Sequence, residues 1–170
     1  AAHYGGAILS DQEFVPTQIT NSTFYANSAQ SGGGISIFGQ AVINNSTFSE
    51  NNSGNGGAVR VGLGGVLSLR NSILANSIGG VDCNKSDSVP AIENIHNLIE
   101  TTGAESTFES CGASLLTSDP QLGPLQNNGG PTQTMALLAG SPAINAGNPA
   151  NCPSADQRGV TRPQGNGCDI

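Results

Sequence analysis

The sequence predicts an all-β fold, a right-handed parallel β-helix (a solenoid) with an irregular C-terminal cap rich in proline and glycine. Its first sign is the phrase Asn-Ser-Thr-Phe at residues 21–24 and 45–48, which returns as Asn-Ser-Ile-Leu at 71–74. Glycine doublets accompany this phrase, at 5–6, 33–34 and 56–57. A repeat of about 25 residues is too short to fold alone, so its apolar side chains must be buried against neighbouring copies.

Apolar residues recur at equivalent positions of the three repeats and form predicted ladders. Short stretches at 35–37, 59–61 and 67–69 alternate with the period of a strand. Equivalent strands of successive coils run the same way, so we expect parallel sheets that climb about 4.8 Å per coil. Leucine-rich repeats, the competing solenoid, need a dense leucine frame that only the third repeat approaches. The ladders are Ile8, Ile35 and Val59; Ile19, Ile43 and Leu69; and Phe24, Phe48 and Leu74.

Asparagine forms a ladder of its own at Asn21, Asn45 and Asn71. Stacked carboxamides can donate to one copy and accept from the other, and asparagine tolerates the left-handed backbone of a sharp corner. We therefore interpret these residues as structural, with ligand contact as the alternative.

One leg of each repeat varies in length while the other stays constant. Counted between the first two apolar ladders, the variable leg spans 11, 8 and 10 residues. Variable loops on a rigid scaffold are where recognition concentrates. Asp11 and Glu13 lie in the longest copy. We interpret them as solvated and predict no cofactor, with weak binding of a cation such as calcium as the alternative.

One domain accounts for all 170 residues. Residues 1–78 hold the three regular coils, and residues 79–118 lose the period and are predicted to continue the helix irregularly. Residues 119–170 change texture and are predicted to form the capping region of the same domain. The chain opens already inside a coil phrase, so we expect upstream coils, or a like subunit docked end to end, to cover that coil.

Composition narrows the partners and the location. Charged residues make up 10% of the chain, which has five Lys and Arg residues and a net charge of −7. Such a chain lacks the basic surface that nucleic-acid binding needs, and no apolar run approaches the roughly 20 residues of a transmembrane segment. Few lysines and an even number of cysteines suit an oxidising compartment, so we predict an extracellular or cell-surface protein.

The four cysteines occur as two neighbouring pairs without the Cys-x-x-Cys spacing of a metal site. Three pairings are possible, and we predict the local one, Cys83–Cys111 and Cys152–Cys168, with free buried thiols as the alternative. These bridges would close loops of 28 and 16 residues. Each would contribute on the order of 3 kcal/mol in the chain-entropy model.

The C-terminal region carries several short motifs in a set order. They include Asp-Pro-Gln-Leu-Gly-Pro-Leu at 119–125, Asn-Asn-Gly-Gly-Pro-Thr at 127–132, Gly-Ser-Pro-Ala-Ile-Asn-Ala-Gly at 140–147 and Cys-Asp-Ile at 168–170. Together with the repeats, these motifs resemble the choice-of-anchor Q domain proteins, relatives of polymorphic outer-membrane-type surface repeats. The resemblance implies a bacterial secreted or surface right-handed β-helix with no established catalytic residues.

The densest group of charges in the chain is Asp156, Arg158, Arg162 and Asp169. Arginine forms bidentate bonds to carboxylates, so we predict an ion-pair network that plugs the open core of the helix. A site for an anionic sugar that uses the two arginines is the alternative.

These observations predict a non-catalytic protein with a structural or adhesive role, as part of a longer rod or extracellular filament. Its partners would be like subunits, other surface proteins or extracellular polysaccharide. The alternative is a polysaccharide lyase, a glycosidase or a carbohydrate-binding module, because β-helices also host that chemistry. A glycosidase needs two carboxylates about 5–9 Å apart, and Asp11 and Glu13 on their loop are the nearest approach to such a pair. Ice binding needs a flat threonine array, which Arg70 interrupts.

Overall fold

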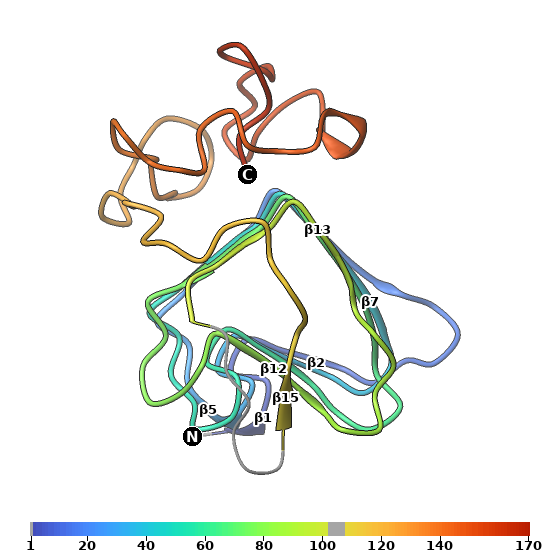
Figure 1. The fold of residues 1–170 in the computed structure, drawn as a ribbon. Coiled ribbons are helices and arrows are strands. Elements are labelled where there is room, and N and C mark those ends of the chain that lie inside the picture. The colour runs from blue at the N-terminus through green and yellow to red at the C-terminus, as the bar shows by residue number, and fades with distance from the viewer. Residues whose placement is uncertain (1, 102–107) are drawn as a thin grey trace.

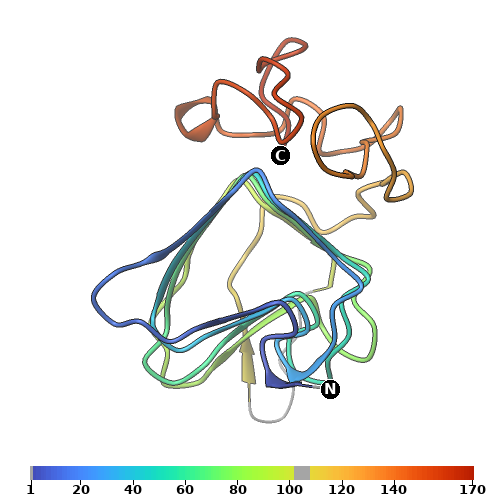
Figure 2. The same ribbon diagram turned by 180° about the vertical axis from the view of Figure 1, so that it is seen from behind.

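The computed structural model describes residues 2–101 and 108–170. Seen along its axis, the helix is a triangle whose three sides are parallel sheets, each with one strand from every one of four coils (Figure 1). The view from behind shows the same triangle with the first coil nearest the viewer (Figure 2). The predicted all-β solenoid is confirmed.

Equivalent strands of the four coils build each side of the triangle. The first side joins β2 (Ile8–Ser10), β6 (Ile35–Ile37), β9 (Val59–Val61) and β12 (Cys83–Ser86). The second side joins β3 (Thr17–Thr20), β7 (Gln40–Asn44), β10 (Val66–Arg70) and β13 (Glu93–Ile95). The third side joins β4 (Thr23–Tyr25), β8 (Thr47–Ser49), β11 (Ile73–Ala75) and β14 (Leu98–Ile99). A short parallel pair, β1 (Ala2–Tyr4) and β5 (Ala29–Ser31), precedes the first side.

The three apolar ladders stand in register inside the triangle, as predicted. Phe24 pairs with Phe48, and Leu74 follows in the next coil. The two phenyl rings stack with centroids 4.4 Å apart and planes 3° from parallel. The ladders of Ile8 and Ile19 pair in the same way with their partners in the second and third coils. Burial of these side chains is what holds successive coils together.

A fourth coil follows the three that the repeats predict. Cys83 pairs with Val59 and Ile99 pairs with Leu74, so each extends an apolar ladder. Asn94 stands opposite Leu69, where the earlier coils carry an apolar residue. Residues 83–99 therefore continue the three sheets although their sequence has lost the repeat. Residues 102–107 of the predicted irregular segment lie outside the described residues.

No further coil follows the fourth within the described residues, and its open end is covered by residues 108–118, which cross the front of the triangle in Figure 1. Strand β15 (Phe108–Ser110) pairs antiparallel with β12. The Cys83–Cys111 disulfide and an ion pair between Lys85 and Glu109 hold this crossing segment. Farther along, the Ile99 N–H donates to the Leu116 carbonyl (3.0 Å).

Residues 119–170 are irregular, as predicted, but they lie along one flank of the helix and not over its end. Strands β11 and β14 are apolar on both faces, so their outward side chains need a second covering layer. Ile73, Ala75 and Leu98 are buried against Ala143 and Ile170 in a second apolar cluster. The C-terminal region therefore covers the outer face of the third side, and residues 108–118 close the core.

Candidate functional site

The corner between the second and third sides is built from residues with a left-handed backbone. Asn21, Asn45 and Asn71 have φ angles of 49°, 45° and 45°, and His96 takes the same place in the fourth coil with φ 51°. Asparagine tolerates this conformation because its short polar side chain bonds locally. The asparagine ladder forms the left-handed corner as predicted, but its amides bond to the C-terminal region and not to one another as the predicted stacking requires.

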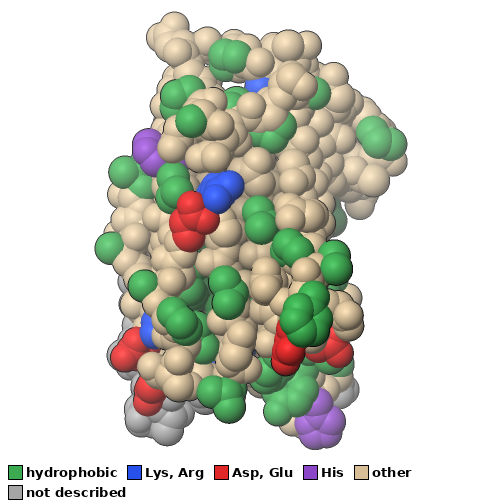
Figure 3. Space-filling model, turned by 90° about the vertical axis from the view of Figure 1, so that its right-hand side faces the viewer, with side chains coloured by type: hydrophobic (Ala, Val, Ile, Leu, Met, Phe, Trp, Pro, Cys, Tyr) green, Lys and Arg blue, Asp and Glu red, His purple; other side chains and the backbone are tan. Residues whose placement is uncertain are grey.

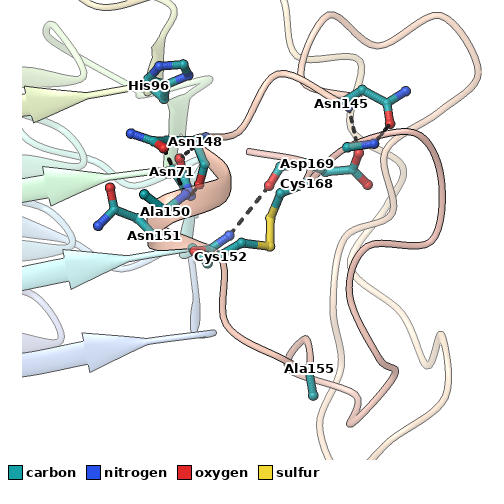
Figure 4. Close-up of a disulfide and its surroundings, with 12 residues drawn as sticks. Asn71, His96, Asn145, Asn148, Ala150, Asn151, Cys152, Ala155, Cys168 and Asp169 are labelled. Atoms are coloured by element: carbon teal, nitrogen blue, oxygen red, sulfur yellow. Dashed lines mark hydrogen bonds between the residues drawn. A yellow bond between two sulfur atoms is a disulfide. The ribbon is translucent and has the colours of Figure 1, made fainter.

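The amides of this ladder turn outward and hold a segment of the C-terminal region, residues 145–157, which we call the strap (Figure 4). Asn71 bonds both polar groups of one strap residue: its Oδ1 accepts from the Asn148 N–H (2.7 Å) and its Nδ2 donates to the Asn148 carbonyl (3.1 Å). The strap thus runs along the corner from the fourth coil to the first. Further bonds along the corner join His96 Nδ1 to the Ala146 oxygen (3.0 Å), Asn44 Nδ2 to the Asn151 oxygen (3.2 Å) and Asn21 Nδ2 to the Ala155 oxygen (2.9 Å).

A disulfide and a short helix give the strap its shape. The helix η1 (Pro149–Asn151) is capped by Asn148, whose Oδ1 accepts from the Ala150 N–H (2.9 Å). Cys152 is bonded to Cys168, which ties the strap to the last residues of the chain (Figure 4). All four cysteines are therefore bridged in the predicted local pairing, with the other bridge at the end of the helix.

The carboxylate of Asp156 organises the turn at the end of the strap. Its Oδ1 accepts from the N–H groups of Arg158 (2.8 Å) and Val160 (3.0 Å). Its Oδ2 accepts from Arg158 Nε (2.8 Å) and Nη2 (2.6 Å). Burial acts to raise the pKa of Asp156, but the hydrogen bonds and the charge of Arg158 outweigh it and hold that pKa below its usual value. Two of the four charged residues predicted to form a network are thus an ion pair.

Arg162 and Asp169 stand apart from that pair. Asn45, with its amide oriented so that both ends find complementary partners, donates to the Asn151 carbonyl (3.1 Å) and accepts from Arg162 Nη1. Asp169 Oδ1 accepts from the Asn145 N–H (2.7 Å). Burial lowers the pKa of Arg162, while the charges of Asp156 and Asp169 act against that shift.

All four charged residues line a cavity of about 390 Å³ between the third side and the C-terminal region. Thr23, Thr47 and Ile73 form its wall on the helix, and Asn45 borders it at the corner. The opposite wall comes from the C-terminal region, including Thr134, Leu137, Asn145 and Gln164. The charged group predicted to plug the helix core lies instead on the flank, around this cavity.

A second surface lies at the corner between the first and second sides, where the leg of variable length runs. Phe14 and Val15 in the first coil are 91% and 71% exposed, and Leu63 and Val66 in the third coil are 69% and 54% exposed. We call these four residues the apolar corner. Hydrophobic side chains gather beside acidic ones on this flank of the molecule (Figure 3). Exposed apolar side chains that form a contiguous patch are typical of interaction surfaces.

The two acidic residues named as the alternative catalytic or cation-binding pair lie on the surface of the first coil. Asp11 and Glu13 are exposed on the first loop, where Gln12 Nε2 donates to Asp11 Oδ1 (2.9 Å). No group of three or more His, Cys, Asp or Glu side chains that could hold a metal ion occurs in residues 2–101 and 108–170.

One buried carboxylate was not singled out by the sequence. Asp82 is fully buried and accepts from the N–H groups of Ser77 (3.1 Å) and Thr101 (2.7 Å), so it closes the turn into the fourth coil. Burial raises the pKa of Asp82, and the hydrogen bonds act against that shift. A lone aspartate in a glycine-rich stretch gives no sequence signal for this role.

Comparison of the chain with protein families, with curated proteins and with solved structures finds no match in any of the three. No helix in the described chain has the length and hydropathy needed to cross a bilayer. The function of the chain is therefore inferred from two of its own surfaces, the apolar corner and the cavity.

Proposed function

We propose that this chain is a non-catalytic secreted or cell-surface β-helix with a structural and adhesive role, of the choice-of-anchor Q kind. The observation that carries the proposal is the apolar corner, which holds large hydrophobic side chains in water. Burying such a side chain is worth about 1.5–3 kcal/mol. Phe14, at 91% exposed, leaves nearly all of that unrealised in the isolated chain, and a partner surface that covers it would recover it.

The scaffold suits presentation of a contact surface. Stacked ladders fix the coils and the Cys83–Cys111 disulfide holds the segment that closes the core, so a loop on one corner is displayed with little loss of order on binding. Disulfides persist in oxidising environments, which supports a location outside the cytosol. Asp11 and Glu13 beside the apolar residues favour a partner with apolar and basic groups, as on another surface protein.

The two ends of the helix differ, and the difference bears on a longer rod. The fourth coil is covered by residues 108–118, whereas Ile8 and Phe24 in the first coil are only partly buried. Further coils, or a second copy, would complete the burial of that first coil. A filament of like subunits needs two different, complementary ends. Two copies that associate through their first coils use the same surface on each copy, so they would form a closed pair and not a filament.

The experiment uses the purified chain with both disulfides intact. Binding to immobilised extracellular proteins is measured for the natural chain, for the double variant Phe14→Ser/Val15→Ser, and for Leu115→Ser as a matched control. Leu115 is 52% exposed and lies away from the apolar corner in the sequence. We expect the double variant to lose binding and the control to keep it.

The enzyme alternative is tested on the same preparation. Turnover of a polysaccharide that disappears when Asp11 and Glu13 are changed to their amides would overturn the non-catalytic proposal. Equal binding by the natural chain and the double variant would show that the apolar corner is not the contact surface. Fractionation of the source cells, with the protein found reduced in the cytosol, would contradict the extracellular location.

A further inference from the structure

One arginine in the cavity keeps most of its hydrogen-bond donors unused. In the part of the chain that the structure describes, the Arg162 guanidinium meets one acceptor, the amide oxygen of Asn45. A guanidinium carries five N–H donors in a planar fork. Arg162 lines a cavity wide enough for a small ligand, since its volume of 390 Å³ falls at the lower end of the range of about 300–1,000 Å³ for ligand sites.

The neighbouring charges do not take up these donors. Arg158 binds the carboxylate of Asp156 through two nitrogens, and Asp169 accepts from the Asn145 N–H. Arg162 is partly removed from water, and an arginine keeps its charge in such a place. Its planar fork matches a carboxylate, which it can bind through two parallel hydrogen bonds.

The walls of the cavity match a sugar better than a simple acid. The amides of Asn145 and Gln164 and the hydroxyl of Thr134 lie among the lining groups. Asn145 Oδ1 accepts from the Gly167 N–H (2.8 Å) and Gln164 Nε2 donates to the Thr161 carbonyl (2.6 Å). The Asn145 Nδ2 donor and the Gln164 Oε1 acceptor are therefore the amide groups that suit the hydroxyls of a sugar ring. Leu137, Ile144 and Pro163 also line the cavity and supply an apolar surface for the carbon face of the ring.

We propose that this cavity binds a carboxylate-bearing sugar, a uronic acid residue, with its carboxylate against Arg162. The polar walls contact the ring hydroxyls and the apolar wall contacts the ring carbons. The cavity lies on the third side, whereas the apolar corner joins the first and second sides. The sugar site therefore does not rest on the adhesive role, and either can fail without the other.

The test is a titration of the oxidised full chain, followed by NMR chemical shifts and by calorimetry. The probes are D-galacturonate and its trimer, with D-galactose and acetate as the comparisons that lack the carboxylate or the ring. We expect saturable binding of galacturonate, with galactose and acetate at least tenfold weaker. Tighter binding of the trimer identifies a polysaccharide chain as the source of the sugar, and equal binding identifies a single terminal or free residue.

The variants are Arg162→Gln, Arg162→Lys and the control Arg70→Gln, which removes an arginine paired with Glu93 on the second side. Loss of charged hydrogen bonds weakens binding roughly 10–100-fold in Arg162→Gln. Arg162→Lys keeps the charge without the fork and loses less, and Arg70→Gln binds as the natural chain does. If Arg162→Gln strongly lowers the thermal midpoint of unfolding, its loss of binding could come from loss of folding, and the affinity of Arg162→Lys then tests the proposal. No saturable binding of galacturonate, equal affinity for galactose, or unchanged affinity in both Arg162 variants would overturn the proposal.

Discussion

Replacing Asn71 by glycine isolates what the strap contributes to stability. Asn71 is fully buried and makes two hydrogen bonds to the backbone of Asn148, of 2.7 and 3.1 Å. Glycine adopts the left-handed backbone of this corner, φ 45°, without strain, so the variant removes the bonds and leaves the corner intact.

The magnitude follows from the two groups left without partners. The N–H and the carbonyl of Asn148 would both lose their hydrogen-bond partner. Leaving a buried polar group unsatisfied costs about 1–3 kcal/mol of folding free energy for each group. Solvent that reaches the strap recovers part of this, so we expect Asn71→Gly to lower the free energy of unfolding by about 2–4 kcal/mol. A small domain has about 5–15 kcal/mol in all.

The matched control is Asn76→Gly in the same coil. Asn76 is also left-handed, with φ 57°, but it is exposed, and among the described residues its Nδ2 donates only to Ser49 Oγ (3.3 Å). The added flexibility of glycine in the unfolded chain is the same in both variants, so it cancels in the comparison.

Urea unfolding of the oxidised proteins gives the difference, read as a shift in midpoint at constant slope. Hydrogen exchange at the Asn148 amide gives the local effect, because the strap opens more often once its bond to Asn71 is gone. If Asn71→Gly loses no more stability than Asn76→Gly and exchange at Asn148 is unchanged, the strap does not hold the corner.

Three further outcomes follow from the same structure. Changing Cys83 and Cys111 together to alanine should lower the free energy of unfolding by about 3–4 kcal/mol, measured in urea, because their bridge closes a 28-residue loop. Phe48→Ala should cost about 3–5 kcal/mol and Phe24→Ala less, since Phe48 is fully buried and Phe24 only partly; equal losses would contradict this. The lowered pKa of Asp156 means that its stabilisation is present above the unfolded-state pKa of about 3.9 and is lost as the pH falls through the folded-state value. Asp156→Asn should therefore flatten the acid side of a plot of urea midpoint against pH.

The repeat and its consequences could be predicted from the chain alone. Ladder residues such as Phe24 and Phe48 are 24 positions apart and meet directly, because each coil adds one copy of the same position. The left-handed corners at the asparagines follow from the conformational range of that residue. Both disulfides join cysteines that are neighbours in the order of cysteines, so spacing was a sufficient guide.

The fourth coil carried a weaker signal. Asn94 stands where the third coil has Leu69, and a bridged Cys83 stands where it has Val59, so the repeat is hard to see in the sequence although the backbone continues. A terminal coil packs on one neighbour and on the segment that covers it. Its inward positions are therefore freed from the pattern, and a disulfide and an amide can replace the apolar side chains.

The strap and the cavity were decided by the tertiary structure. The bond between Asn71 and Asn148 joins residues 77 positions apart, and the C-terminal region has no period that could set such a register. A sequence clue existed in β11, where Ile73 and Ala75 face outward on a strand that should be polar on that side. This clue predicts that another segment covers the third side. Which segment does so depends on the packing of side chains and on the hydrogen bonds of the corner amides, and both appear only in the tertiary structure. Arg162 acquires its neighbours through that fit, because the side chains around it come from the helix corner and from both ends of the C-terminal region.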